Sequence, residues 1–576
     1  MSRDLKISIG QHSDKGRKET NQDFHGAVIP GHPALGLKGI AIALADGISS
    51  SSVSRIASES AIKSFLADYY CTSDSWSVKT SAQRVISAIN SWLHAQTRRS
   101  QFAYDKDKGY VCTLSVVVVK STTAHIFHVG DSRIYRVSGN ALEQLTDDHR
   151  VVISSEQSYL GRALGANSQI DIDYREVPLE KGDVLVMVTD GVYEHLGDAF
   201  VTKAIVDHAE DLDRAAKVIV EEAYRLGSPD NLTAQIVRVD ELPSGDASEV
   251  LGAISELQLP PLLEARMIFD GYKVLRQIHA SSRSHIYLVI DTESDEIVAL
   301  KIPSIDLRGD EAYLKRFMME EWVARRIDNA HVLKPRLQSR KRNYLYVVTE
   351  YVEGKALAQW MNDNPKPDLE AVRGIIEQIA RGLQAFHRLE MLHQDLRPQN
   401  IMIDTNGTVK IIDFGSARVA GVLEASPTIN GNDILGTAQY TAPEYFLAEG
   451  GSPRSDMFSL GVIAYQMLTG QLPYGAQVAQ ARTRSKQRQL AYHSARGRNP
   501  DIPLWVDGAL EKAVHPDPSK RYQALSEFVF DLRHPREEFL RSSPPPLLER
   551  SPQLFWKGLS FLLACAVLAL LAYPIR

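Results

Sequence analysis

Short apolar runs that each end at an aspartate recur through the first 240 residues of the chain. "GIAIALADG" ends at Asp46 and Gly47, "HIFHVGDSR" contains Asp131, and "DVLVMVTDG" ends at Asp190 and Gly191. Such β-branched and apolar runs are typical of buried β-strands. Helical segments such as "SRIASESAIKSFLADYY" lie between them, so we expect this block to form an α+β layered fold.

Aspartates at strand ends can converge at one edge of a sheet. Carboxylate oxygens are hard ligands, which suit Mg²⁺ or Mn²⁺ better than Zn²⁺. A single Asp-Gly pair usually marks a turn, so this interpretation depends on several of them following one another.

The composition argues against a few classes of protein. The 576 residues, 44% of them hydrophobic and 24% charged, are enough for several ordinary globular domains. A net charge of -6 without a long basic run gives no reason to expect a nucleic-acid partner. The three cysteines are too scattered for a disulfide framework, and the N-terminus lacks the apolar run of a signal peptide, so we expect a reducing compartment.

The C-terminal end is different, because Gly558 to Ile575 carries no charge. Eighteen helical residues span about 27 Å, close to the hydrocarbon core of a bilayer. Trp556, Lys557 and Tyr573 are residue types that favour the membrane interface. The alternative is a buried helix, but such a helix normally keeps a polar face. We therefore expect one membrane helix over 554–575, with the domains that precede it in the cytoplasm.

Breaker-rich segments indicate the other boundaries. The Pro-Ser-Gly and Pro-Pro pairs within 241–268 indicate a linker, and "RSSPPPLLERSP" makes 536–553 an extended spacer. Two blocks of catalytic size remain, 1–240 and 269–535.

Seven segments of the first block follow one another in a specific order: "GRKETNQD", "ADG", "GDSR", "LTDDHR", "GRALG", "VTDG" and "PDNLT". In this order the block resembles a metal-dependent serine/threonine protein phosphatase of the type 2C class. The resemblance implies a β-sandwich and a two-metal site that hydrolyses phosphoserine and phosphothreonine. It implies that Asp46 bridges two metal ions, that the Gly47 carbonyl helps to hold one, and that Asp190 and Asp230 bind the other. Asp131 would either bind a third, weaker metal ion or brace its loop.

The resemblance also implies groups that act on water and phosphate. Asp23 would position metal-bound water, and Arg17 would bind the substrate phosphate as a guanidinium fork. Two departures from the family pattern stand nearby. Gln22 replaces a common Glu, and "ISSSS" follows "ADG" where many members have glycines or His.

The second block contains "VALK", "YVVTEYVEG", "HQDLRPQN", "IIDFG", "TAPE" and "DPSKRY" in that order. It resembles a eukaryotic-like serine/threonine protein kinase, which implies a two-lobed α+β fold. By that resemblance Lys301 pairs with the phosphates of ATP and Glu320 holds Lys301 in place. Asn400 and Asp413 would bind Mg²⁺, while Asp395 would orient and deprotonate the attacking hydroxyl.

The same resemblance implies a nucleotide pocket and an internal ion pair. Glu444 and Arg521 would form the pair and support the large lobe. The pocket would be lined, besides Lys301, Glu320, Asn400 and Asp413, by Ile278, Ile286, Ala299, Glu350 and Val352.

Two departures affect the kinase block. "IHASSRSHIY" has His279, Ser281 and Ser284 where the family has three glycines that let backbone N–H groups approach the phosphates, so ATP binding is expected to be weaker. Gln394 replaces an Arg that commonly pairs with a phosphate on the activation segment, so activation should not depend on that switch.

Together these patterns predict a membrane-anchored bifunctional enzyme that uses ATP, Mg²⁺ and Mn²⁺. Its partners would be proteins that carry Ser/Thr or the corresponding phosphates, with its own chain as one candidate. The main alternative is an active phosphatase regulated by a weak or silent kinase-like domain that binds nucleotide or a partner. A scaffold without activity conflicts with two complete sets of catalytic carboxylates.

Overall fold

A computed structural model describes residues 4–154, 157–243, 257–281, 283–307, 310–336, 340–425, 438–540, 555–560 and 562–563. The chain forms two compact units. The first comprises residues 1–355, 381–395 and 400–436, and the second comprises 356–380, 396–399 and 437–576.

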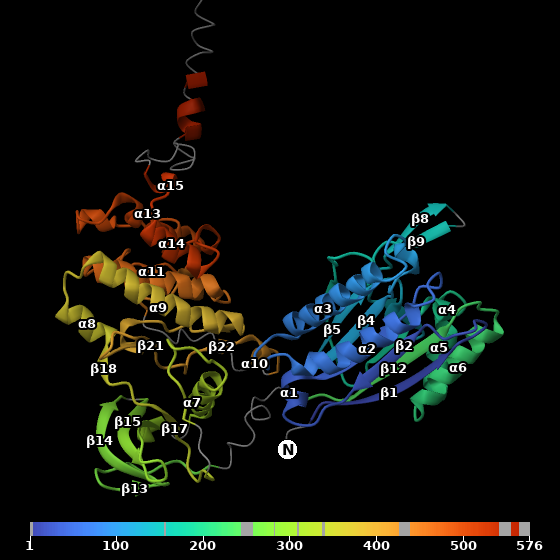
Figure 1. Cartoon of the computed structure of the whole chain (residues 1–576), viewed down its shortest axis with the longest axis horizontal. Coiled ribbons are helices and arrows are strands. Elements are labelled where there is room, and N and C mark those ends of the chain that lie inside the picture. The colour runs from blue at the N-terminus through green and yellow to red at the C-terminus, as the bar shows by residue number, and fades with distance from the viewer. Residues whose placement is uncertain are drawn as a thin grey trace, which may run out of the picture. The chain divides into compact units, whose positions relative to one another are not determined.

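The N-terminal part of the first unit contains two five-stranded sheets (Figure 1). All strand pairs within them are antiparallel. The first sheet has the order β1 (Lys6–Asp14), β12 (Leu232–Glu241), β11 (Val184–Val188), β6 (Arg133–Ser138) and β7 (Ala141–Gln144). The second has the order β10 (Asp173–Pro178), β5 (Thr123–Val129), β4 (Leu114–Lys120), β3 (Ile40–Ala45) and β2 (Phe24–Val28).

Strand β3, "IAIALA", shows how the sequence builds this sandwich. Successive side chains of a strand point to opposite faces. Ile40, Ile42 and Leu44 belong to the core that they share with β11 and β12, whereas the intervening alanines pack in the cluster beneath two helices. Large residues therefore fill the space between the sheets, and small ones let the helices approach closely.

Helices cover both outer faces of the sandwich. Helices α2 (Ser54–Cys71) and α3 (Val78–Arg99) pack on the second sheet, and α5 (Asp198–Asp207) and α6 (Leu212–Arg225) pack on the first. The short helices α1 (Ala34–Lys38) and α4 (Asp190–Tyr193) and the hairpin of β8 (Arg150–Ser154) with β9 (Gln157–Leu160) complete this part. The α+β layered β-sandwich expected from the sequence is confirmed.

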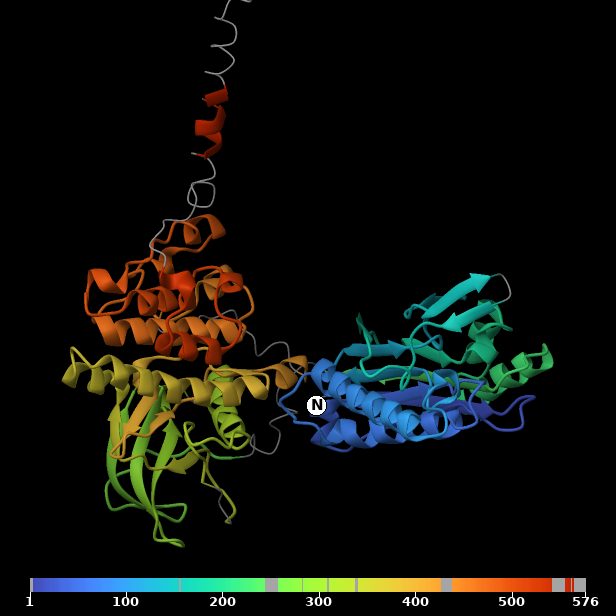
Figure 2. The same ribbon diagram turned by 45° about the horizontal axis from the view of Figure 1, so that its top comes forward.

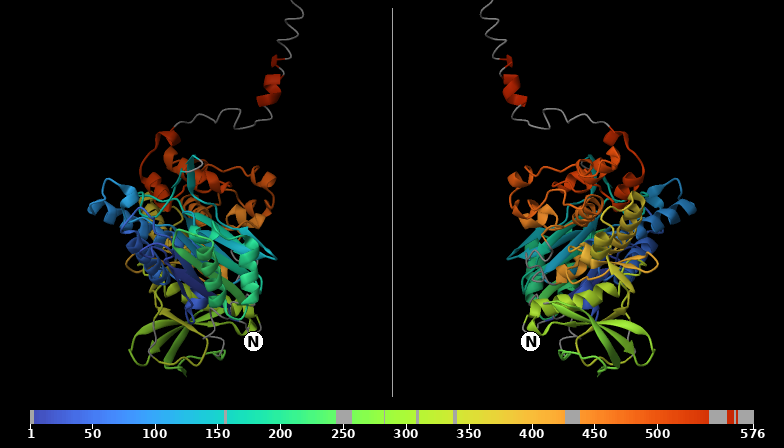
Figure 3. Two further views of the ribbon diagram at one scale, coloured as in Figure 1. Left: turned by 90° about the vertical axis from the view of Figure 1, so that its right-hand side faces the viewer. Right: turned by 90° about the vertical axis from the view of Figure 1, so that its left-hand side faces the viewer.

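The first unit also contains a third sheet, seen as a twisted fan of green strands in Figure 3. Its antiparallel strands are β13 (Ile268–Phe269), β14 (Tyr272–Ala280), β15 (Ser284–Asp291), β16 (Ile297–Pro303) and β17 (Val347–Glu350). Helix α7 (Glu311–Ala324) follows β16 in the chain, and the Asp310 carboxylate caps it by accepting the N–H of Tyr313. Short strands carry the loops of this unit: β19 (Met391–Leu392), β20 (Ile401–Asp404), β21 (Val409–Ile411) and β22 (Arg418–Val419), followed by α10 (Ala420–Ala425).

The second unit is helical, and its helices run from yellow to red in Figure 2. They are α8 (Leu357–Asp363), α11 (Pro453–Thr469), α12 (Arg484–Gln487), α13 (Leu504–Ala513), α14 (Leu525–Arg533) and α15 (Glu537–Leu540), while α9 (Leu369–Arg388) belongs to both units. Helix α11 is buried on nearly all sides, and Gly461 lets α13 approach: a Cβ there would lie 2.8 Å from a Val514 methyl.

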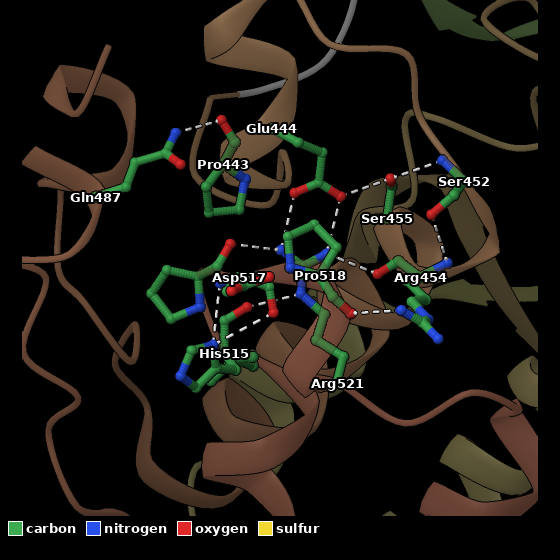
Figure 4. A network of polar contacts seen from close by, with 12 residues as sticks. Pro443, Glu444, Ser452, Arg454, Ser455, Gln487, His515, Asp517, Pro518 and Arg521 are labelled. Carbon is green, nitrogen blue, oxygen red and sulfur yellow. Dashed lines mark hydrogen bonds and ion pairs between the residues drawn. The ribbon is translucent and has the colours of Figure 1, made fainter. Parts of the chain in front are cut away.

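A buried ion pair organises the second unit, and Figure 4 shows it with its neighbours. The Arg521 guanidinium donates from Nη1 and Nη2 to the two oxygens of Glu444, each at 2.8 Å, and the side chains are 0% and 5% exposed. Arg521 Nε donates to the His515 carbonyl, and Ser455 Oγ donates to Glu444. The predicted pair is therefore present, with the additional hydrogen bonds that a buried pair requires.

Two of the predicted segments, the linker and the membrane helix, are only partly among the described residues. Within the segment predicted to be a linker, 241–268, the apolar residues Leu257, Leu259 and Leu263 pack against residues of the third sheet or its neighbours. Among the described residues no helix is long and apolar enough to cross a membrane. Most of the segment predicted to be a membrane helix lies outside the described residues.

Candidate active sites

Five aspartates lie where strands of the sandwich begin or end. Asp46 follows β3, Asp131 follows β5 by two residues, Asp190 opens α4 two residues after β11, Asp230 precedes β12, and Asp23 precedes β2. Their mutual electrostatic influence places them in one cluster, because the pKa of Asp46 is affected by the other four. The structure thus brings together the five aspartates that were predicted to contribute to the metal site.

Without cations, burial and mutual repulsion disfavour the ionised form of the carboxylates in this cluster. Burial, followed by the charges of Asp23, Asp190, Asp131 and Asp230, raises the pKa of Asp46 well above its usual range. Burial raises the pKa of Asp23 to about 6, and burial with the neighbouring Asp131 and Asp230 raises the pKa of Asp190 to about 7. A nearby positive charge lowers the pKa of a carboxyl group and so favours its ionised form.

Two buried oxygens of the cluster fit this requirement for cations. Asp23 Oδ2 accepts hydrogen bonds from Thr189 at 3.0 Å and from Thr233 at 2.7 Å. Asp23 Oδ1 and Asp190 Oδ1 are buried, and neither has a hydrogen-bond partner among the described residues. Unpaired carboxylate oxygens are suitable ligands for Mg²⁺ or Mn²⁺.

Gly47 and Gln22 shape the loop behind Asp46. A Cβ on Gly47 would lie 2.8 Å from the Gln22 carbonyl and 3.0 Å from Ser54, so only glycine fits there. The Gln22 amide donates to the Ser51 carbonyl at 2.9 Å and to Ser54 Oγ at 2.7 Å. Gln22 therefore fastens the serine-rich segment that follows "ADG", a role that the sequence alone did not reveal.

A lysine that the sequence analysis did not select lies at the cluster. Lys18 Nζ contacts the Asp230 carboxylate and donates to Ser49 Oγ at 2.5 Å. Arg17, the predicted phosphate ligand, instead donates to the Gly227 carbonyl at 3.1 Å and lies 5.4 Å from the centre of the Tyr224 ring. The position of Lys18 next to Arg17 was the only signal in the sequence.

A second cation, Arg150 at the start of β8, contacts both Asp131 and Asp190. Within the described part of the chain no three ligating side chains surround one point closely enough to bind a metal ion as they stand. Basic side chains, Lys18 and Arg150, thus accompany the carboxylates on which metal ions would depend.

In the third sheet Lys301 is held by two carboxylates. Its Nζ lies 2.8 and 2.6 Å from the two oxygens of Glu320 and 3.6 Å from Asp413 Oδ1. Burial acts to lower the pKa of Lys301, but Asp413 and Glu320 outweigh it and keep that pKa above its usual value. Lys301 is therefore a fixed positive charge between β16 and α7.

Asp413 is positioned by its neighbour Phe414. The buried Phe414 ring lies 5.5 Å from Phe386 and 6.4 Å from His393, measured between ring centres. Asp413 itself has a φ of 78°, a region that a non-glycine residue adopts only when its surroundings compensate for the strain. The packing of Phe414 thus holds the backbone of Asp413 in this conformation, with the Asp413 carboxylate near Lys301.

Asp395 and Asn400 are joined across their loop. Asn400 Nδ2 donates to the Asp395 carbonyl at 2.8 Å and to Asp395 Oδ2 at 3.1 Å. Asn400 is 4% exposed. Its amide oxygen remains available as a ligand, because both of these bonds use the amide nitrogen.

The predicted nucleotide-binding residues lie on or beside the third sheet. Ile278 is on β14, Ile286 pairs with Lys301 across β15 and β16, and Ala299 pairs with Thr349 of β17. Val352 follows β17. Glu350 Oε1 accepts from Lys410 Nζ at 2.8 Å and from the Lys334 N–H at 2.9 Å, so its side chain is engaged in the protein.

The serine-containing loop between β14 and β15 closes upon itself. Ser281 Oγ accepts the N–H groups of Arg283 at 3.2 Å and of Ser284 at 3.1 Å. The Tyr313 hydroxyl of α7 and the Ser304 N–H both donate to the Arg283 carbonyl. Ser281 therefore uses backbone N–H groups of the loop that glycines would leave available.

The C-terminal half of the chain matches a family described as protein kinase domain, over residues 272–529. Relatives include serine/threonine-protein kinase PrkC of Bacillus subtilis, which is 30% identical over 47% of this chain and 41% of its own length. Serine/threonine-protein kinase PknL of Mycobacterium bovis is 34% identical over 37% of this chain and 52% of its own length. The chain thus spans about half the length of these curated relatives, or less.

The N-terminal half matches the family described as protein phosphatase 2C, over residues 11–235. One similar solved structure is the catalytic domain of serine threonine protein phosphatase PstP in complex with two manganese ions. It is 22% identical, with a TM-score of 0.35, and the match covers 41% of this chain and 100% of that one. The chain therefore contains a protein phosphatase 2C domain followed by a serine/threonine protein kinase domain.

Proposed function

We propose that this chain is a bifunctional enzyme that transfers phosphate from ATP to Ser/Thr of proteins and hydrolyses the resulting phosphate esters. The observation that carries the proposal is that both catalytic sets are assembled in one chain. Five carboxylates converge in the sandwich, and Lys301 is paired with Glu320 and Asp413 in the kinase domain.

The kinase residues have distinct tasks in the proposed reaction. Lys301 would hold the α- and β-phosphates of ATP, because Glu320 keeps its ammonium group in place. Asn400 and Asp413 would hold Mg²⁺, which when bound neutralises charge on the phosphates. Asp395 would orient the substrate hydroxyl and take its proton while Asn400 fixes the Asp395 carboxylate.

In the phosphatase domain Asp23, Asp46, Asp190 and Asp230, with the Gly47 carbonyl, would hold two divalent cations. Such ions supply a nucleophile at neutral pH and stabilise charge in the displacement. We assign phosphate binding to Lys18 rather than Arg17, because the Lys18 ammonium lies at the carboxylate cluster whereas Arg17 is engaged with Gly227 and Tyr224.

One observation favours the alternative, a phosphatase regulated by a silent kinase-like domain. Ser281 occupies loop N–H groups through its hydroxyl, so the nucleotide phosphates would find fewer free donors. The complete set of Lys301, Glu320, Asp395, Asn400 and Asp413 favours catalysis. We therefore expect an active kinase that requires more ATP than one with a glycine loop.

We further propose that the chain is its own substrate. Residues 242–256 connect Glu241, where β12 ends, to the packed Leu257. Tethered domains meet at effective concentrations that can reach about the millimolar range if the tether is flexible. The wild-type chain, incubated with ATP, Mg²⁺ and Mn²⁺, should then carry almost no phosphate when its intact mass is measured. Asp190→Asn should accumulate phosphate, because its phosphatase loses a metal ligand.

The double variant Asp190→Asn with Asp395→Asn supplies the control, since it also lacks the kinase base and should remain unmodified. If Asp190→Asn alone gains no mass, a generic basic protein added to the same tube separates two explanations. Phosphate on that protein would show an active kinase that does not act on itself. Its absence would favour the silent kinase-like domain.

We also propose that the apolar segment 558–575 attaches the enzyme to a membrane, on the basis of its length and lack of charge. Deleting residues 554–576 should move the protein from the membrane fraction to the soluble fraction without loss of either activity. Cell fractionation with a carbonate wash measures this. A truncated protein that still pellets with membranes would contradict the proposal.

A further inference from the structure

Arg150 uses all three guanidinium nitrogens on carboxylates of the phosphatase site. Nε donates to Asp131 Oδ2 at 2.6 Å, Nη2 donates to Asp190 Oδ2 at 2.9 Å, and Nη1 donates to Glu194 Oε1 at 2.6 Å. The Arg150 side chain is 25% exposed, and Asp131 and Asp190 are 12% and 24% exposed. A guanidinium thus connects Asp131, which was expected to bind a third metal ion or to brace its loop, with Asp190, which was expected to bind one of the two main ions.

The backbone at Arg150 is fixed to the loop that carries Asp131. The preceding residue, His149, donates its N–H to the Gly130 carbonyl at 2.8 Å, and its Nδ1 accepts the Gly130 N–H at 3.1 Å. His149 Nε2 also lies 2.9 Å from Asp173 Oδ2. These bonds hold the first residue of β8 beside Asp131, so Arg150 reaches the cluster from an anchored position.

The two oxygens of Asp190 have different surroundings. Oδ2 accepts from Arg150, while Oδ1 is buried without a hydrogen-bond partner among the described residues. Oδ1 can therefore bind a metal ion of the two-metal site while Oδ2 stays with the guanidinium. At Asp131 the oxygen Oδ2 accepts the Nε hydrogen bond of Arg150 at 2.6 Å.

A divalent ion between Asp131 and Asp190 would need the same oxygens and the same space as the guanidinium. Arginine remains charged at any physiological pH, so this competitor cannot be removed by deprotonation. Its three N–H contacts also match three separate acceptors, which a single ammonium group could not span in the same way.

We propose that Arg150 is a built-in cation that replaces a third metal ion at Asp131 and Asp190, so that the phosphatase holds two divalent ions and not three. This inference rests on the proposed phosphatase function. Under this proposal Asp131 holds Arg150, so it acts as a structural brace and not as a metal ligand.

The test is the number of Mn²⁺ ions bound per chain, measured by calorimetric titration and by metal analysis after desalting. The full chain is used without nucleotide and carries Asp413→Asn, so that the kinase domain contributes no ion. We expect two ions in this parent and three in the parent with Arg150→Ala. Arg136→Ala is the matched control. Arg136 lies on β6 and pairs with Asp183, so its loss should leave the number of bound ions at two.

Adding Asp131→Asn to Arg150→Ala should return the count to two, which places the extra ion at Asp131. Three ions in the parent, or no third ion in the Arg150→Ala protein, would overturn the role of Arg150. No tightly bound ion in the parent would instead contradict the two-metal phosphatase itself.

A thermal melt checks that the variants are folded and gives an independent reading. Ligand binding stabilises the folded state in proportion to the logarithm of ligand concentration over Kd. Arg150→Ala should therefore lower the melting temperature without metal and show a larger upward shift with Mn²⁺ than the parent. An equal shift in the two proteins would also count against the proposal.

Discussion

Asp46→Asn is expected to lower hydrolysis of a small phosphate ester by at least about two orders of magnitude, or about 2.7 kcal/mol of activation free energy. Asp46 is the carboxylate whose pKa all four neighbouring aspartates affect, so it lies at the centre of the cluster. The Asn amide keeps the shape of the Asp side chain but removes the negative charge that two divalent ions would share. Hydrolysis of p-nitrophenyl phosphate by the full chain with Mn²⁺ measures the loss.

Asp68→Asn is the matched control, because Asp68 is an exposed residue of α2 and the same charge is removed away from the cluster. It should leave hydrolysis unchanged. Kinase activity should be the same in both variants. A loss of less than about tenfold in Asp46→Asn would show that the ester is hydrolysed without a metal bridge at this aspartate.

Lys301→Met should reduce phosphate transfer by about two orders of magnitude or more. The change removes the cation that would hold the nucleotide phosphates and leaves Glu320, which is 6% exposed, without its counter-charge. Transfer is measured with γ-labelled ATP in the Asp46→Asn background, so that the attached phosphatase does not remove the label. The reaction should be saturated with a generic protein acceptor.

Lys273→Met controls for the loss of a lysine from the same sheet, since Lys273 is exposed on β14. Glu320→Gln should have a smaller effect than Lys301→Met, because a neutral amide can still accept one hydrogen bond from Lys301. Full transfer by Lys301→Met would mean that ATP is held by other groups, and the proposed roles in this domain would need revision.

Much of both sites could be predicted because their residues stand at the ends of recognisable apolar strands. The strand pattern selected Asp46 and Asp190, the resemblance to the phosphatase family added Asp230, and the structure places the three in one cluster. The pairing of Lys301 with Glu320 was likewise expected across 19 positions of sequence.

The basic side chains were harder to predict. Arg17 and Lys18 are neighbours, and which of them faces the carboxylates depends on the turn at Gly16, where φ is 58°. Arg150 stands far from Asp131 and Asp190 in the sequence, and its role depends on the backbone bonds between His149 and Gly130. Composition and motif spacing contain no information about such local geometry.

The serine loop shows the same limit. Ser281 and Ser284 were read only as obstacles to the nucleotide, whereas Ser281 Oγ satisfies two N–H groups and stabilises the turn. The packing of leucines within the predicted linker was not foreseen either, because Pro-Pro pairs suggest an open chain even where adjacent leucines pack.

The buried pair of Arg521 and Glu444 has a consequence for the amounts of the two activities in a cell. Removing one partner of a buried pair typically costs about 3–5 kcal/mol, a large part of the stability of a domain. Unfolded protein is removed by proteases. Because kinase and phosphatase are made as one polypeptide, turnover triggered by a damaged Arg521 would also remove the intact phosphatase domain. Turnover of the whole chain would thus keep the two activities in equal numbers even when only one domain is defective.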